Sequence, residues 1–563
     1  MIDQFELDDG IKSASYQDDK DDVVVQITEP VADTSRHHLH RKLTPRHLQL
    51  ITIAGGIGSA LFVLIGTALV SGGPVPLVLG MLFWCSVIWA VSNFQMEITT
   101  LLPLDGGFMA HASRFVDPAF GCAVGYNYFI TSAAILNYEI TILNVVLSYW
   151  FNDLNPAIVI SILLVVFAAL NVWTVKWFGE VEFWVAIGKI LLVFGLAFFT
   201  LVTMCGGNPI HDKYGFRYWR DPSPWVGASP FERLQALWST IIFAAFSIVG
   251  PDFMSLMAGE VKNPRRVLPG VYKSTTFRLL LFYGLGAFCV ATVCASDDEQ
   301  LLSAIKVGSA GAAKSPYVVA MKRLQIPYLG SIVNAAVLVS LLSTANTFVF
   351  TTSRSLHGLA LAGQAPSIFR RLNRMGVPYV SVGAALALGC LSYLQMSAGT
   401  YKVLGWWVNI TTCSEILTWV VMGITYVFFD RALKAQGLHG SGFLPIKARW
   451  PLASAWYVIV VVGFTCIFQA YTIMSPSTFD GLTFFFAYAA IFIFIAIFVG
   501  WKLVKRTSFV RPDEADLISD IASLDAYTEE CEAELAQIIQ PRLDRFINAN
   551  RVKEGPAGFG LTS

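Results

Sequence analysis

The sequence predicts an all-helical protein that crosses a membrane about twelve times and contains two interrupted spans. Hydrophobic residues make up 55% of the 563 residues, charged residues make up 14%, and the mean hydropathy is +0.59. Soluble domains contain about 25% charged residues, so this composition excludes a soluble fold. The first and sixth spans each contain residues that break a helix, which is typical of transporters with a solute site near the middle of the bilayer.

Each predicted span is an apolar stretch that can cross a bilayer as a helix, for which about 20 residues are needed. In order, the stretches cover 48–70, 76–101, 121–148, 156–175, 182–205, 234–257, 275–295, 330–354, 378–396, 403–429, 453–474 and 481–503. An even number of spans places both ends of the chain on the same side of the membrane.

Lysine and arginine near the span ends indicate which side that is. The two sides hold 22 and 9 of these residues, and the richer side is normally cytoplasmic. The polar residues before the first span contain no apolar core, so no cleavable signal peptide is expected. We therefore expect a multi-pass protein of the lipid bilayer with both termini in the cytosol.

The chain divides into three predicted parts. Residues 1–46 form a polar, disordered cytosolic tail, 47–505 form the twelve-helix domain, and 506–563 form a cytosolic C-terminal tail. Apolar residues recur at helical spacing between 513 and 549, which predicts one or two amphipathic helices there. The tails are candidate targets of ubiquitin-ligase machinery, with Lys12 and Lys20 as alternative modification sites in the first of them.

The break in the first span is the run Gly55-Gly56-Ile57-Gly58-Ser59. Glycines in membrane helices often serve close helix packing, which is the alternative interpretation. Three glycines within four residues favour unwinding instead. Unwinding exposes backbone N–H groups at the positive end of the second half-helix, and these donors suit a carboxylate.

The break in the sixth span is Gly250-Pro251-Asp252. Proline removes a backbone donor, so we expect the helix to end after Val249 and to leave free carbonyl groups at its negative end. Those acceptors suit an ammonium group. A site with one anion-binding end and one cation-binding end fits a zwitterion, which is the form of a free amino acid.

Ionisable residues inside the predicted spans are candidates for function, because an unpaired charge in the membrane is costly. They are Glu97, Glu139, Lys189, Asp252 and Glu415. Glu97 lies near a span end, where reaching water or pairing is the simpler explanation. Glu139 and Asp252 are more central, and a buried carboxyl group can take up and release a proton near neutral pH.

Five motifs occur in order along the chain. They read AGGIGSALF at 54–62, GGFMAHASRFVDPAFGCAVGYNYF at 106–129, AGEVKNPRRVLP at 258–269, SRSLHGLALAGQAPSIFRRLNRMGVPYV at 353–380 and ALKAQG at 432–437. These motifs resemble those of the fungal amino-acid permeases, in the amino acid, polyamine and organocation superfamily. The similarity runs from about residue 43 to 505 and leaves out both tails.

The resemblance implies an inverted repeat of five plus five helices with two added helices, and uptake coupled to protons with no other cofactor. It also assigns substrate-binding positions. Besides the glycines at 55 and 56, these are Ile57, Gly58, Ser59 and Ala60 in the first span and Phe246, Ser247, Val249 and Gly250 in the sixth.

The resemblance further implies roles for three charged residues. Glu139 matches a third-span carboxylate that is a candidate proton acceptor or ligand for the substrate amine. Lys189 matches a fifth-span lysine that takes the place of sodium in sodium-coupled relatives. Asp252, which stands where many members carry glutamate, is a candidate for gating or proton coupling.

Three positions depart from the pattern of those permeases. Ala60 replaces a usual glycine, Asp252 is one methylene shorter than glutamate, and Glu415 stands where a small residue is usual. Glu415 either favours a substrate with a basic side chain or pairs with a neighbour outside the site. The sequence leaves both readings open.

The function predicted from these features is a proton symporter that imports L-amino acids across the plasma membrane by alternating access. A vacuolar location is the less favoured alternative. An amino-acid sensor with little transport is the alternative function. Nucleic-acid binding has no support, and no enzyme is expected, because His111 and His357 are single residues with no second ligand at metal spacing.

Overall fold

The protein is mainly helical. The computed structural model describes residues 12–16, 23–27, 44–56, 58–151, 154–172, 175–248, 250–306, 315–398, 400–471, 479–534 and 536–537. Among these residues, nine helices are long and apolar enough to cross a membrane, and three shorter apolar helices lie in the remaining predicted spans. The predicted all-helical membrane domain with about twelve spans is therefore confirmed.

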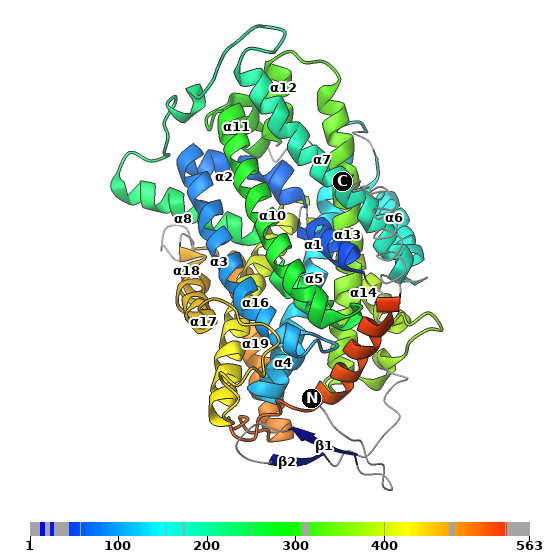
Figure 1. Cartoon of the computed structure of the whole chain (residues 1–563). Coiled ribbons are helices and arrows are strands. Elements are labelled where there is room, and N and C mark those ends of the chain that lie inside the picture. Colours follow the sequence, from blue (N-terminus) through cyan, green and yellow to red (C-terminus); the bar gives the residue numbers. More distant parts are fainter. Residues whose placement is uncertain are drawn as a thin grey trace, which may run out of the picture. The chain divides into compact units, whose positions relative to one another are not determined.

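The spans follow the chain in a simple order (Figure 1). They are α1 (Pro45–Gly56) with η2 (Ala60–Leu64) and α2 (Ile65–Gly72), α3 (Pro74–Leu101), α5 (Pro118–Leu147), α6 (Pro156–Val172), α7 (Val175–Met204), α8 (Pro230–Ser247) with α9 (Pro251–Leu256), α10 (Pro264–Val293), α13 (Leu329–Leu361), α14 (Tyr379–Gly389) with η7 (Cys390–Leu394) and α15 (Gln395–Ala398), α16 (Thr400–Ala435), α17 (Pro451–Tyr457) with η8 (Val458–Val462) and α18 (Gly463–Phe468), and α19 (Gly481–Lys505).

Short helices connect the spans. They are α4 (Phe108–Phe115), η3 (Arg217–Trp219), η4 (Ala258–Glu260), α11 (Glu299–Lys306), α12 (Pro316–Arg323) and η6 (Ser367–Arg370).

Local sequence explains where several helices begin. Asp117 caps α5 by accepting a hydrogen bond from the Ala119 amide at 2.7 Å, and proline stands at the first position, where no N–H is needed. Ser229 and Glu232 form a capping box at the start of α8.

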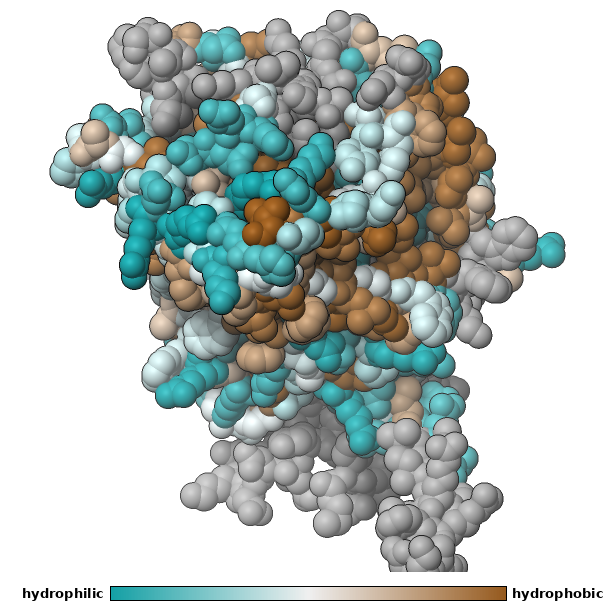
Figure 2. Space-filling model, turned by 90° about the horizontal axis from the view of Figure 1, so that it is seen from above, coloured by the Kyte–Doolittle hydropathy of each residue, from teal (hydrophilic) through white to brown (hydrophobic). Residues whose placement is uncertain are grey.

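The helices differ in how deeply they are buried. The most apolar window of α5 is 83% buried, whereas the corresponding windows of α7 and α19 are only 28% buried. α5 packs against α13 and α16, so it lies at the centre of the bundle. Strongly hydrophobic side chains border a hydrophilic region on the face shown in Figure 2. Large apolar side chains that are exposed on outer helices, such as Trp184 and Phe277, suit contact with lipid.

The described part of the N-terminal tail forms a separate unit. Strands β1 (Lys12–Tyr16) and β2 (Val23–Ile27) pair in antiparallel register, with Ala14 opposite Val25. The sequence analysis expected this tail to be disordered, whereas the structure has two paired strands in it. The run of three valines that begins β2 has a high preference for strands, and it explains the pairing.

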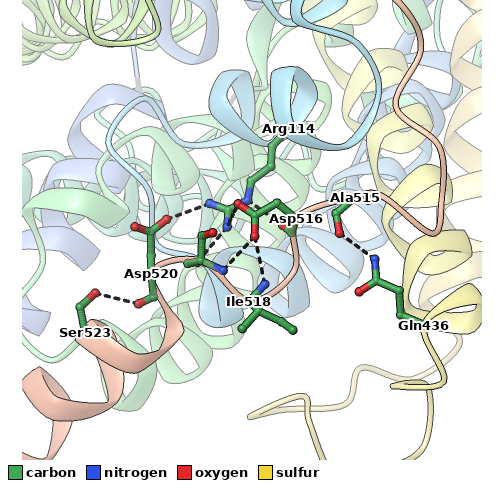
Figure 3. Close-up of polar contacts among 8 residues, drawn as sticks. Arg114, Gln436, Ala515, Asp516, Ile518, Asp520 and Ser523 are labelled. Atoms are coloured by element: carbon green, nitrogen blue, oxygen red, sulfur yellow. Dashed lines mark hydrogen bonds and ion pairs between the residues drawn. The ribbon is translucent and has the colours of Figure 1, made fainter. Parts of the chain in front are cut away.

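The C-terminal tail packs against the end of the helical bundle that carries α4. Its residues 521–534 are helical, within the range predicted for an amphipathic helix, and residues beyond 537 lie outside the described part of the chain. Leu517 and Leu524 are buried. Arg114 of α4 holds the tail through Asp516, at 2.7 Å, and Asp520, at 2.8 Å, and through two backbone carbonyls (Figure 3).

We expect Arg114→Gln to release the tail. The amide cannot replace a guanidinium that contacts two carboxylates and two carbonyls. Protease cleavage and hydrogen exchange of residues 515–525 should then increase in the purified full-length protein. Arg511→Gln is the matched control, because its side chain is 74% exposed and its one ion pair among the described residues is with Glu514. Equal protection in the Arg114 variant and the wild type would contradict this contact.

The docked tail should also respond to acid. Partial burial acts to raise the pKa of Asp516, but hydrogen bonds from Ser519 and the charge of Arg114 outweigh it and hold this pKa below its ordinary value. A depressed pKa in the docked state stabilises docking above about pH 4, and this stabilisation is lost as the pH falls further.

Candidate substrate site

The first span is interrupted between α1 and η2. α1 continues through Gly56, so Gly55 and Gly56 are helical and the break is shorter than predicted. Ile57 lies outside the described residues, Gly58 forms a bend, and Ser59 leads into the π-helical turn η2. α1 keeps its two terminal glycines in the helix because it packs against α7, α10 and α13.

The sixth span is interrupted earlier than predicted. α8 ends at Ser247, Ile248 is extended, and α9 begins at Pro251, while Val249 lies outside the described residues. The physical reason is the missing N–H of Pro251. In a continuous helix that N–H would bond to the carbonyl four residues earlier, which belongs to Ser247. The effect of the proline therefore appears at 247 and not at 249.

One side chain connects the two breaks. The Tyr283 hydroxyl of α10 lies 2.8 Å from the carbonyl oxygen of Ser247 and within hydrogen-bond reach of the carbonyl oxygen of Gly56. These two carbonyls end the first halves of the two broken spans. Tyr283 is fully buried. Sequence analysis missed this residue, because an isolated tyrosine in an apolar span carries no signal of its partners.

The two breaks line a common cavity, called here the first cavity. Seven of the predicted substrate-binding residues line it: Gly55, Gly56, Gly58, Ser59, Ala60, Phe246 and Ser247. Glu139, predicted for proton coupling, lines it as well, together with Ile135, Thr344 and Phe348. α1, η2, α5, α8 and α13 contribute these residues. The structure thus brings together residues as far apart in the sequence as Gly55 and Phe348.

Glu139 lies directly at the first break. Its Oε1 atom is 3.1 Å from the Ser59 hydroxyl, which also lies 3.0 Å from the Tyr138 hydroxyl. The other carboxyl oxygen of Glu139 is buried and has no hydrogen-bond partner among the described residues. A Cβ atom on Gly58 would lie 2.8 Å from Oε1 of Glu139, so a larger residue at position 58 would displace this carboxyl group from its present position.

Lys189 lies behind the first cavity. Its ammonium group donates a hydrogen bond of 2.9 Å to Thr344, which lines the cavity, and its charge acts on both Glu139 and Glu182. Glu182 accepts hydrogen bonds from Ser343 and Asn346 at 2.5 and 2.8 Å. The sequence analysis missed Glu182 because it stands at the predicted start of its span. Its spacing of seven residues from Lys189, two helical turns, was the available signal.

A second cavity adjoins the first. Its walls are Thr52, Gly55, Gly56, Tyr128, Thr131, Ser132, Ile135, Gly250, Asp252, Phe253, Phe348 and Glu415. Asp252 accepts hydrogen bonds from the Tyr128 hydroxyl, at 2.7 Å, and from the Gly250 amide, at 3.2 Å. Glu415 of α16 faces this same cavity and not the first one.

Glu97 belongs to neither cavity. It is buried near the end of α3 and accepts a hydrogen bond of 2.5 Å from Tyr426. Of the two explanations expected for Glu97, reaching water or pairing with a neighbour, the structure favours pairing, because the side chain is buried and Tyr426 donates to it.

Comparisons with known proteins identify relatives over most of the chain. A family described as amino acid permease matches residues 47–512. The proline-specific permease of Emericella nidulans is 37% identical over 87% of this chain and 90% of its own. A general amino acid permease of Saccharomyces cerevisiae is 35% identical, with coverages of 90% and 88%. The dicarboxylic amino acid permease of the same yeast is 34% identical, with coverages of 85% and 79%.

A crystal structure of a manganese transporter from Eremococcus coleocola aligns with 85% of this chain and 96% of its own, at 12% identity and a TM-score of 0.49. The named relatives are transport proteins and not enzymes.

Proposed function

The chain belongs to the amino acid permease family, and from this premise we propose that it imports L-amino acids across the plasma membrane together with protons, by alternating access. Both termini then lie in the cytosol, as the distribution of lysine and arginine indicates. The amino acid occupies the first cavity, and its carboxylate and ammonium groups face the two helix breaks.

The position of Glu139 is the observation that carries the proposal. Its carboxyl group already lies beside Ser59, at the place where the first break offers donors to a substrate carboxylate. Two carboxylates in one buried site repel each other, and one of them is protonated in such pairs. Substrate binding at this break is thus linked to proton uptake by Glu139.

The other charged residues have supporting roles in this scheme. The carbonyl of Ser247, which ends α8, accepts from the substrate ammonium group. Lys189 supplies a fixed positive charge where sodium-coupled carriers hold their ion. Asp252 gates the inner side, because its contacts with Tyr128 and Gly250 tie the sixth-span break to α5.

Uptake of labelled amino acids by the full-length protein in a permease-deficient yeast cell tests this proposal. Collapse of the proton gradient with a protonophore is expected to reduce uptake to the level of cells without the protein. Addition of substrate to lightly buffered cells should also make the medium more alkaline. Uptake that persists after the gradient is collapsed would contradict proton coupling but not amino-acid transport.

A further inference from the structure

Asp252 and Glu415 are two carboxyl groups that face one buried cavity. We propose that this second cavity binds the positively charged end of the substrate side chain, so that the preferred substrates are amino acids with a long cationic side chain. This inference rests on the proposed function. It names the substrate class and assigns Glu415 as the residue that selects it.

Glu415 is a buried carboxyl group with one oxygen atom left without a partner in the part of the chain that the structure describes. Its side chain comes from the middle of α16 and is 2% exposed. Its Oε1 atom is buried and has no hydrogen-bond partner among the described residues. Asp252, by contrast, accepts hydrogen bonds from Tyr128 and Gly250. Of the two carboxyl groups, Glu415 is therefore the one with an oxygen atom free to accept a hydrogen bond from a ligand.

Among the described residues, no lysine or arginine charge acts on this carboxyl pair. In the described part of the chain, neither Asp252 nor Glu415 forms an ion pair, and the charge of Lys189 acts on Glu139 and Glu182 instead. A buried carboxylate without a counter-charge is costly, and a second carboxylate beside it increases the cost. A cation that enters the cavity removes this penalty.

The cavity walls favour an organic cation. Tyr128, Phe253 and Phe348 line it, and aromatic faces attract ammonium and guanidinium groups. A proton on one carboxyl group would also relieve the repulsion, but it makes no use of the aromatic walls. The chemistry therefore points to an ammonium or guanidinium group held between carboxylates and rings.

The two cavities are placed so that one molecule can occupy both. Gly55, Gly56, Ile135 and Phe348 line the first and the second cavity alike, so the cavities share a wall. An amino acid whose backbone lies between the helix breaks can extend its side chain past these residues. Lysine, ornithine and arginine have the required length and charge.

Comparison of lysine with norleucine tests this inference, because the two differ only in the terminal ammonium group. Uptake kinetics are measured for the full-length wild type and for Glu415→Gln. We expect wild type to prefer lysine, and we expect Glu415→Gln to raise the KM for lysine by at least about tenfold while the KM for norleucine changes little. Glu415→Asp, which keeps the charge, should retain part of the preference.

Glu97→Gln is the matched control, because it also neutralises a buried glutamate but lies outside both cavities. It should leave the ratio of the two KM values unchanged. Norleucine uptake by each variant shows that the protein is folded and has reached the plasma membrane. If Glu415→Gln is not delivered, Phe253→Leu removes an aromatic wall at similar volume and should raise the KM for lysine alone.

The remaining outcomes separate the two proposals. Equal losses for lysine and norleucine in Glu415→Gln would overturn the inference and assign the carboxyl pair to a proton used with every substrate. No change for either substrate would overturn it as well. Wild type that carries norleucine but not lysine would overturn the inference alone, whereas a delivered protein that carries none of the twenty amino acids would contradict the proposed function.

Discussion

Glu139→Gln is expected to abolish concentrative uptake while exchange of substrate across the membrane persists. Glutamine has the same shape as glutamate and can keep the contact with Ser59, but its amide cannot release a proton. An outside pH one unit below the inside pH supplies about 1.4 kcal/mol for each proton carried, so coupled transport concentrates substrate about tenfold more than uncoupled transport. The variant should lose this factor.

The steady-state ratio of internal to external substrate measures this loss, and counterflow of labelled against unlabelled substrate measures exchange. Glu97→Gln serves as control, since it removes a buried charge from α3 that contacts Tyr426 and lines neither the first nor the second cavity. Accumulation by the Glu139 variant at the wild-type ratio, still sensitive to a protonophore, would show that another group carries the proton.

The second large effect is expected at the buried ion pair between Arg354 and Glu260. These side chains come from α13 and from η4, directly after α9, and their atoms approach to 3.1 Å. Both are nearly inaccessible, at 3% and 1% exposure. Arg354→Met removes the positive charge and leaves Glu260 buried without it. Breaking such a pair costs about 3–5 kcal/mol.

Thermal unfolding of the purified protein in detergent should therefore begin at a clearly lower temperature for Arg354→Met. The double variant Arg354→Met, Glu260→Gln leaves no uncompensated charge, so it should recover part of the loss. Arg354 also stacks over the Phe350 ring at 3.8 Å, which methionine replaces only in part. If the double variant is no more stable than the single one, packing and not charge accounts for the loss.

Sequence and structure agree most closely where the signal is a long apolar run. Helix boundaries differ where polar residues begin a helix. α10 starts at Pro264, eleven residues before the predicted stretch, because its first turns carry Arg265, Arg266 and Lys273 at the end of the bundle. Hydropathy detects the part of a helix that lipid or apolar neighbours surround. It does not detect the polar turns by which the same helix extends past that apolar part.

The site could be predicted in its parts but not in its arrangement. Glycine and proline mark both breaks, and charged residues stand out against an apolar background. Glu139 lines the first cavity and Glu415 lines the second. Which cavity each residue reaches depends on how α5 and α16 pack against the broken spans, and no local sequence pattern predicts that packing. Neutral partners such as Tyr128 and Tyr283 are missed for the same reason.

The Tyr283 hydroxyl has a consequence for motion. It carries a single proton, but two helix ends present acceptors to it, so the proton bonds fully to only one of them at a time. When one helix end moves away, the hydroxyl can turn toward the other. Rearrangement at either break then gives up at most one neutral hydrogen bond, about 1 kcal/mol. If one helix end moves, Tyr283 can therefore stay bonded to the other end, at a small energetic cost to the movement.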